Sequence, residues 1–264
     1  MVIGVSTAML YPRDTNEYLN IVARCGITRI EVMIQDLSEC SGGFGADLAK
    51  RAADNGIWIE AIHYPLILSG FFHNPYPAAV CTARTISRGV VECSVCAGAK
   101  RIVAHSCPSG LDLPGFREAS IQNLRYLRDL ASGHGVVVAL ENVRSTITAS
   151  PTEFGRMAGQ EGLAMTVDVT ECGESGYDPA EFILAVGCPE HVHLSDYAPG
   201  KVHLPPGHGL IDWESTFRAL RQVGYEGMLS LEISWRHALY DAEDVIARSV
   251  AFIKEKCAGL QIES

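Results

Sequence analysis

Short apolar runs, often rich in β-branched residues, alternate along the chain with longer amphipathic stretches. Runs of the first kind are typical of buried strands, and the stretches between them have the apolar spacing of helices that pack on one face. The pattern predicts strands at 3–7, 28–33, 57–62, 101–105, 136–141, 163–168, 190–194 and 227–232. It predicts helices at 15–25, 44–55, 77–97, 115–133, 151–160, 178–186, 213–223 and 242–257.

The order of these elements favours a closed barrel. Several predicted helices end at a glycine just before the next strand, as expected of an α-to-β connection. Alternating strands and helices imply parallel strands with right-handed crossovers, and eight such units permit closure. An open doubly wound sheet normally carries a glycine-rich turn after its first strand, which residues 6–10 lack. We therefore predict an α/β fold, a single (β/α)8 TIM barrel over residues 1–264, with its active site at the C-terminal ends of the strands.

Composition agrees with this fold and excludes several classes of protein. Apolar residues make up 47% of the 264-residue chain and charged residues 20%, and no linker-like stretch divides it. With 21 Lys and Arg against 31 Asp and Glu, the net charge is −10, which disfavours a nucleic-acid partner. Because the sequence shows neither a signal peptide nor a long apolar run, we expect a cytoplasmic protein without a membrane partner.

The cysteines do not indicate a disulfide framework or a zinc site. The nine of them are odd in number and irregularly spaced. Cys93 and Cys96 form a lone C-x-x-C, without the second pair of a four-cysteine zinc site or the preceding strand of a redox motif. We expect free, mostly buried thiols.

Ionisable residues lie at the ends of most of the predicted strands. The third to eighth strands each finish in a His, Asp or Glu: His63, His105, Glu141, Asp168, His193 and Glu232. Taken singly, such residues are more often hydrogen-bonded structural histidines or helix-capping carboxylates. Together they follow apolar runs in which ionisable groups are costly to bury, and the barrel directs all of them to one mouth. The joint pattern therefore predicts a functional site.

This set of residues suits a metal ion. Three carboxylates cannot share a dry pocket as bare anions without a cation or shifted pKa values. A set of Glu141, Asp168, His193 and Glu232 would suit Mn²⁺, Mg²⁺, Co²⁺ or Zn²⁺. For His63 and His105 two roles stay open: contacts to substrate hydroxyls, which we favour, or ligands of a second metal near Glu141.

The segment 188–213 holds four of the nine histidines. His191 and His193 stand two apart in a predicted strand, so both rings project from one side. We expect His193 to be a ligand and His191 to be a supporting or buried ring. The turn at 205–209 should stiffen the chain beyond them, which makes 196–208 a segment suited to substrate specificity.

Several segments of the chain together resemble a known superfamily. They are Leu140-Glu141-Asn142, Val167-Asp168, 191–196, 203–213, and Gly224-Tyr225-Glu226-Gly227 leading to Leu231-Glu232. As a combination they resemble the xylose-isomerase-like barrels, which include sugar isomerases and epimerases, inosose dehydratases and the endonuclease IV group. The resemblance spans nearly the whole chain. It implies a metal held by Glu141, Asp168, His193 and Glu232.

Two branches of that superfamily differ from this chain in specific ways. Endonuclease IV resemblance implies two metals held by the six strand-end residues, all present here. Its third metal lacks ligands, because Glu171 and Lys201 replace an expected histidine and aspartate and only His203 remains. The ketose 3-epimerases share the four-ligand set, but their substrate-contacting histidine also falls at Glu171 and their loop arginine has no clear match. We therefore expect the core chemistry to transfer and the substrate to differ.

The resulting hypothesis is a divalent-metal-dependent isomerase or epimerase acting on a sugar, keto-sugar or related polyol. The metal would stabilise the enediolate formed when an α-proton leaves, and Glu141 and Glu232 would be the acid/base pair. We predict that five further residues bind the substrate: His63, His105, Glu171, Lys201 and His203. Of these, Lys201 or His203 would bind a distal hydroxyl, carboxylate or phosphate.

Other hypotheses remain open at this point. One is a metal-dependent dehydratase of an inosose-like or keto-acid substrate, which would share the first proton abstraction. Others are an endonuclease IV-like phosphodiesterase and a non-catalytic sugar-binding barrel with a structural metal. The expected partner is a small polyhydroxylated molecule, and a homo-oligomer is compatible with the sequence. Aromatic residues such as Trp235 would wall the substrate, whereas Trp58, inside a strand, is expected to pack in the core.

Overall fold

Eight parallel strands close into a barrel in the computed structural model, which describes residues 1–111 and 113–257. Around the ring the order is β1-β10-β7-β6-β5-β4-β3-β2. The strands are β1 (Val2–Ser6), β2 (Arg29–Met33), β3 (Trp58–His63), β4 (Arg101–His105), β5 (Val137–Glu141), β6 (Ala164–Asp168), β7 (His191–Leu194) and β10 (Met228–Leu231). The ring closes where β1 pairs with β10, with Val2 opposite Met228. The predicted TIM barrel is confirmed.

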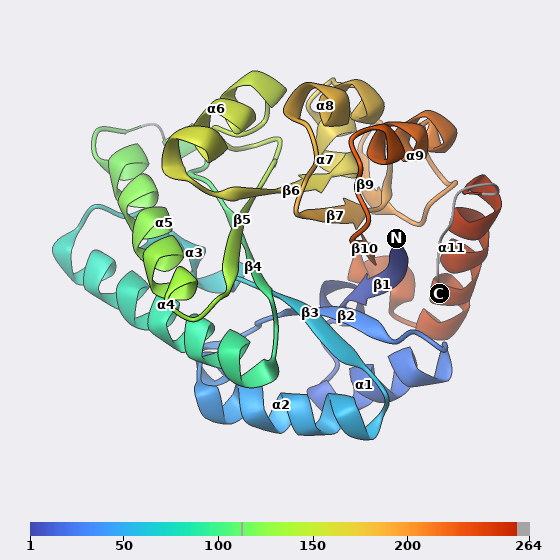
Figure 1. Ribbon diagram of the computed structural model, residues 1–264, viewed down its shortest axis with the longest axis horizontal. Helices are drawn as coiled ribbons and strands as arrows, with labels where there is room; N and C mark the ends of the chain where they lie inside the picture. The colour runs from blue at the N-terminus through green and yellow to red at the C-terminus, as the bar shows by residue number, and fades with distance from the viewer. Residues whose placement is uncertain (112, 258–264) are drawn as a thin grey trace.

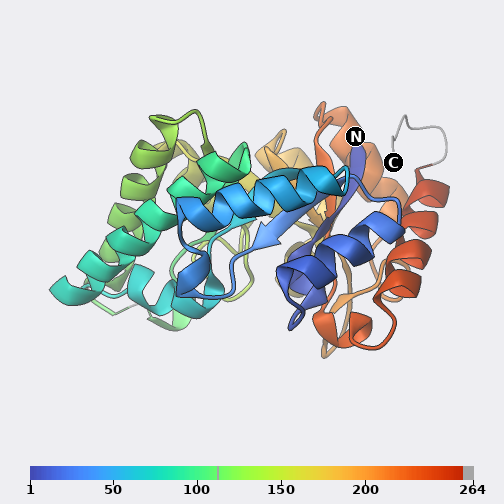
Figure 2. The same ribbon diagram turned by 90° about the horizontal axis from the view of Figure 1, so that it is seen from below.

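Helices surround the strands on the outside of the barrel (Figure 1). The longer ones are α1 (Thr15–Arg24), α2 (Gly42–Asp54), α4 (Pro77–Ala97), α5 (Phe116–Ser132), α6 (Pro151–Glu161), α8 (Pro179–Val186), α9 (Trp213–Gln222) and α11 (Ala242–Lys256). Many begin where a Ser or Asp side chain accepts a hydrogen bond from a first-turn N–H, as Ser150 does for α6. Figure 2 shows α4 and α5 at one end of the molecule and α11 at the other.

Shorter elements, which the periodicity did not predict, lie mostly in the connections that follow the strands. They are η1 (Thr7–Leu10), η2 (Leu37–Glu39), η3 (Leu66–Leu68), α3 (Ser69–Phe72), η4 (Ser109–Leu111), α7 (Val169–Glu174), α10 (Trp235–Ala238) and the antiparallel hairpin of β8 (Asp196–Ala198) and β9 (Lys201–Leu204). A run of a few residues is too short to show a helical or strand period. Residues of η1, η3, α7, β9 and α10 line the site described below.

The prediction that Trp58 packs in the core is wrong. Its side chain is 66% exposed, at the first residue of β3, and the guanidinium of Arg29 lies 5.5 Å from the centre of its ring. The position is at the N-terminal end of the strand, on the side of the barrel away from the strand-end residues. An apolar run shows that a strand exists, but not which of its residues stands at the solvent-facing rim.

The connection from β7 to α9 is built around the buried carboxylate of Asp196. It accepts four hydrogen bonds of 2.9–3.2 Å, from the backbone N–H groups of Tyr197, Gly207 and Ile211 and the indole N–H of Trp213. A Cβ at Gly209 would collide with the carbonyl oxygen of Tyr197 and the carboxylate of Asp196, so only glycine fits there. The predicted stiff segment is thus a loop held from inside by one acidic side chain.

No helix within residues 1–111 and 113–257 combines the length and the apolar character that crossing a bilayer requires. The Cys93–Cys96 pair consists of free thiols, the first buried and the second exposed, as expected from the lone motif.

We predict that Asp196→Asn destabilises the protein by about 2 to 4 kcal/mol, because the new amide would direct donors at N–H groups that now have an acceptor. Urea unfolding followed by circular dichroism measures the change. The matched control is Asp212→Asn, since Asp212 is exposed and caps α9, a position where Asn serves as well as Asp. Equal losses in the two variants would contradict a special role for the Asp196 carboxylate.

Candidate functional site

Four of the six strand-end residues converge at one point of the barrel mouth. Glu141 and Asp168 are the last residues of β5 and β6, His193 lies in β7, and Glu232 directly follows β10. One ligand atom from each lies within 4.8 Å of the others, and all four side chains are buried. The predicted set of three carboxylates and one imidazole is therefore assembled by the fold.

The imidazole of His193 lies at the centre of this group. Its Nδ1 is 2.9 Å from Glu232 Oε2, 3.2 Å from Glu141 Oε1 and 3.9 Å from Asp168 Oδ2. Burial by itself would lower the pKa of His193, but the surrounding carboxylates outweigh it and raise the pKa well above the usual range. In the absence of another cation, a protonated His193 balances the carboxylates.

Asp168 shows that the site can accept a further cation. Its Oδ1 accepts a hydrogen bond of 2.9 Å from the backbone N–H of Glu171, at the start of α7. Its Oδ2 is buried and has no hydrogen-bond partner among the described residues. Burial raises the pKa of Asp168 well above its usual range, and the charges of Glu232 and Glu141 add to the rise against the opposing charge of His203. A buried, unpartnered oxygen among like charges fits a metal ion.

His63 and His105 lie on the other side of Glu141. Their Nε2 atoms are 3.3 Å and 2.9 Å from Glu141 Oε2, and the three side chains form a second group within metal-ligand spacing. His63 Nδ1 donates to the carbonyl of Tyr64 at 2.8 Å, which directs Nε2 at the mouth. Burial would lower the pKa of His63, but its hydrogen bond to Glu141 and the charge of Glu141 raise it to about 9. Both roles considered for these histidines remain compatible with the geometry.

Sequence reasoning missed Glu31, which lies inside β2. Its Oε2 is 2.9 Å from Nε2 of both His191 and His193. Burial would raise the pKa of Glu31, but the charges and hydrogen bonds of the two histidines hold it well below the usual range. Glu31 thereby fixes His193 so that Nδ1 faces the other carboxylates, the arrangement by which a second carboxylate orients a metal-binding imidazole. His191 is the buried supporting ring that was expected.

A signal for Glu31 was present in the sequence. A glutamate between Ile30 and Val32 interrupts an apolar strand, where an unpaired charge is too costly to bury. The strand ends at Met33, so Glu31 lies in its middle and does not belong to the strand-end set.

The three candidates from the loops are placed differently. The His203 ring lies at the mouth, with Nε2 3.5 Å from Glu171 Oε1 and Nδ1 3.1 Å from Ser195 Oγ. Burial would lower the pKa of His203, but Glu171 and Asp168 raise it to about 10. Lys201 is exposed and lines an adjoining pocket. His203 has a φ of +48°, which breaks the alternation of β9, so two residues that stand two apart face different spaces.

A cavity of about 530 Å³ opens above these residues. Tyr11, Met33, Leu66, Ile67, Ile233 and Trp235 are among its apolar walls, and His63, His105, Glu141, Glu171, His203 and Glu232 are among its polar ones. The rings of Tyr11 and Trp235 meet edge to face at 5.8 Å. Such a space, mostly apolar with a few converging polar groups, is typical of a small-molecule site.

Comparison with known proteins agrees with this architecture. Residues 19–256 match a family model described as the xylose isomerase-like TIM barrel. Among solved structures, a D-psicose 3-epimerase studied with D-fructose has a TM-score of 0.81 at 16% identity, covering 97% of this chain and 99% of that one. A D-allulose 3-epimerase from Methylomonas sp., solved with D-allulose, has a TM-score of 0.79 at 18% identity, covering 96% of each.

Two further relatives extend the comparison. The IOLI protein, solved with a zinc atom, has a TM-score of 0.79 at 17% identity, with 99% of each chain covered. An uncharacterised protein of Methanocaldococcus jannaschii is 24% identical over 151 residues, 53% of this chain. The match spans about half of that relative, 51% of its length. At these identities the likeness to the solved structures establishes the fold alone.

We predict that metal affinity rises with pH. The pKa values of His193 and Asp168 are both raised, so each group keeps its proton to a higher pH than usual, and a metal ion must displace those protons to bind. Raising the pH removes these protons, so affinity should increase by up to about tenfold per pH unit for each proton released. Competition between the protein and a chromogenic chelator for Mn²⁺ or Zn²⁺, from about pH 6 to about pH 8, measures it. Affinity that does not change with pH would contradict the expectation.

We also predict that Glu31→Gln weakens metal binding by about 10- to 100-fold, because the charge that orients His193 is lost. Calorimetric titration with Mn²⁺ or Zn²⁺ measures the change. Glu60→Gln is the matched control, since Glu60 on β3 pairs with Arg29 and Arg101, which do not belong to the four-residue group. That variant should lose stability and keep its metal affinity. A Glu31→Gln protein with unchanged affinity would show that Glu31 does not position His193.

Proposed function

This chain belongs to the xylose isomerase-like TIM barrel family, and on that premise we propose that it is a divalent-metal-dependent isomerase or epimerase of a sugar, keto-sugar or related polyol. One observation carries the proposal. Two buried glutamates, Glu141 and Glu232, line the mouth cavity, each with a carboxylate oxygen within 3.2 Å of His193 Nδ1. A structural metal site would not need two carboxylates placed as separate proton carriers.

The residues that would hold the metal are Glu141, Asp168, His193 and Glu232. Their three carboxylates and one imidazole suit Mn²⁺, Mg²⁺, Co²⁺ or Zn²⁺, and the unpartnered Asp168 Oδ2 supports the fit. When bound, such an ion would stabilise negative charge that develops on a substrate oxygen. A second ion near His63, His105 and Glu141 is the alternative to their binding substrate hydroxyls.

Glu141 and Glu232 would move the proton. Burial would raise both pKa values, but the charge of His193 outweighs it and lowers them, so both side chains are carboxylates able to accept a proton. They stand on β5 and just after β10, with β6 and β7 between them, and so reach the cavity from different directions. One would remove the α-proton from one face of the substrate, and the other would return a proton to the opposite face.

The remaining cavity residues would orient the substrate and exclude water. His203 is held by Ser195 and by the carbonyl of Glu232, each 3.1 Å from its Nδ1, which leaves Nε2 and the nearby Glu171 facing the cavity. These polar groups would bind hydroxyls. Tyr11 and Trp235 would cover the carbon face of the substrate. A dehydratase would use the same proton abstraction and then expel a β-hydroxyl, so the product decides between the two reactions.

The test is metal-dependent exchange of substrate α-protons with D₂O, across a panel of ketoses, inososes and keto acids. Mass spectrometry would follow deuterium uptake with Mn²⁺, Mg²⁺, Co²⁺ and Zn²⁺ added in turn. We expect exchange with at least one substrate, reduced by about 10²- to 10⁴-fold in Glu232→Gln and in Glu141→Gln because each loses a proton carrier. The exposed Glu181→Gln is the control and should keep full activity.

The alternatives give different results in the same experiments. Absence of exchange with every substrate, while Glu232→Gln still binds metal and ligand as the wild type does, would favour a non-catalytic sugar-binding barrel. Loss of a β-hydroxyl after exchange would identify a dehydratase. Efficient incision of abasic-site DNA, assayed alongside, would overturn the proposal in favour of a phosphodiesterase.

A further inference from the structure

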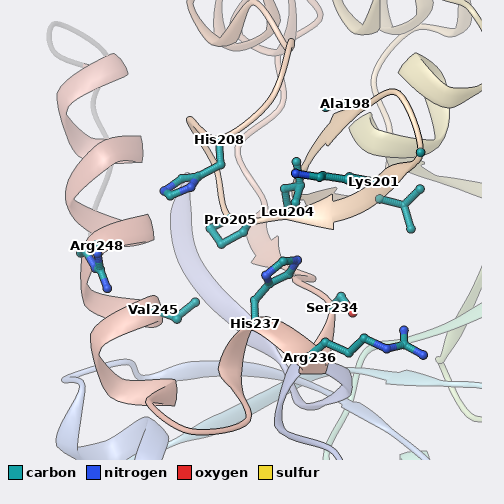
Figure 3. Close-up of a pocket in the computed structure, with 12 residues that line it drawn as sticks. Ala198, Lys201, Leu204, Pro205, His208, Ser234, Arg236, His237, Val245 and Arg248 are labelled. Carbon is teal, nitrogen blue, oxygen red and sulfur yellow. The ribbon is translucent and has the colours of Figure 1, made fainter.

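A second pocket, of about 680 Å³, adjoins the mouth cavity. Its walls come from the β8–β9 hairpin, the turn that follows β9, α10 and α11 (Figure 3). It shares Val202, Ser234 and Arg236 with the mouth cavity, so the two spaces meet along this edge. A substrate with its reacting carbons beside Glu141 and Glu232 would therefore have room to extend into the second pocket.

The second pocket is lined by basic residues. They are Lys201, His208, Arg236, His237 and Arg248, and none of the described lining residues is Asp or Glu. This differs from the chain as a whole, in which acidic residues outnumber basic ones by 31 to 21. In Figure 3, Lys201, His208, His237 and Arg248 stand on different sides of the pocket. Such a distribution favours an anionic ligand.

Two of these cations lack a carboxylate partner. Arg248 is paired with Asp244 on α11, whereas neither Lys201 nor Arg236 forms an ion pair with any residue in the described part of the chain. The guanidinium of Arg236 instead lies over the ring of Trp235, 4.9 Å from its centre, at the edge shared by the two spaces. Their charges are available to a ligand that bridges them.

The basic residues on different walls of the pocket influence one another electrostatically. Burial lowers the pKa of His237, and the charges of His208 and Lys201 lower it further. His208 lies in the turn after β9, Lys201 at the start of β9 and His237 in α10. A bound anion would relieve their mutual repulsion.

A hydrogen bond connects one wall of the pocket to the chain segment that carries Glu232. The backbone N–H of Ser234 donates to the carbonyl of His203 at 2.8 Å, which joins the hairpin to the segment after β10. That segment begins with Glu232 and continues to Arg236. A group held in the pocket would therefore be positioned relative to a proposed proton carrier.

We propose that this pocket binds the phosphate group of a phosphorylated sugar or polyol whose other end lies at Glu141 and Glu232. The inference rests on the proposed function and adds the substrate class. A phosphate monoester carries about −1.5 to −2 charges and three acceptor oxygens, which suits several separate cationic donors. Arg and Lys are the side chains that commonly bind phosphate. A neutral sugar would leave Lys201 and Arg236 without a charged partner.

The first test measures binding of inorganic phosphate to the whole protein by calorimetry, at constant ionic strength set with sodium chloride. We expect saturable binding that becomes at least about tenfold weaker in Lys201→Gln, the effect of one lost charge-assisted hydrogen bond. Lys254→Gln removes the same charge from an exposed position on α11 outside the pocket and should bind as the wild type does. No saturable binding, or equal weakening in both variants, would overturn the inference.

A second readout locates the ion. Phosphate in the pocket should raise the pKa of His237, followed by NMR of its C2 proton and assigned with the His237→Gln protein, because the ion opposes the charges that now lower that pKa. Phosphate bound only at the mouth, on a metal, would leave the His237 titration and its dependence on Lys201 unchanged. That result would also overturn the inference.

The third test separates this inference from the proposed function. D₂O exchange is compared for ketoses and their terminal phosphate esters, and we expect kcat/KM to be at least about tenfold higher for the esters. Exchange with ketoses and esters at equal kcat/KM would keep the proposed function and overturn the phosphate pocket. Phosphate binding that depends on Lys201, with no exchange on any substrate, would keep the pocket and overturn the proposed function.

Discussion

The site depends on the electrostatic balance around one buried imidazole. His193 has Glu31 on its Nε2 side and Glu141, Asp168 and Glu232 on its Nδ1 side. Carboxylates buried this close together repel one another unless a cation lies between them. The geometry at the barrel mouth is therefore tied to the charge held at its centre, whether that charge is a proton on His193 or a metal ion.

The rest of the mouth holds these charged groups in place. Asn142, the residue after β5, accepts a hydrogen bond of 2.8 Å from the N–H of Asp168 and donates one of 3.1 Å to its carbonyl oxygen. The hydroxyl of Thr148 donates to the carbonyl of Glu141 at 2.9 Å. The first two bonds join the ends of β5 and β6, and the third joins the end of β5 to the loop that follows it, so the carboxylates are fixed by the backbone as well as by one another. Directional support of this kind is what a site for positioned proton transfer needs.

Charge is divided between two adjoining spaces. The mouth contains the buried carboxylates, whereas the pocket behind the β8–β9 hairpin is lined by lysine, arginine and histidine. Asp196 holds the loop that separates them, and Arg236 stands where they meet. An acidic protein thus carries a local cationic surface beside its buried carboxylates, an arrangement that would suit a substrate with an anionic group at one end.

Much of this organisation was determined by the sequence itself. The strand and helix periods, and the strand-end positions of Glu141, Asp168 and Glu232, follow from local pattern and from the rule that parallel barrel strands direct their C-terminal ends to one mouth. The tertiary structure alone decided that Glu31 meets His191, 160 residues further along the chain, and that Lys201 and His203 face different pockets. No local signal sets such contacts, because they depend on the register of distant strands and on a backbone turn at His203 that strand periodicity does not describe.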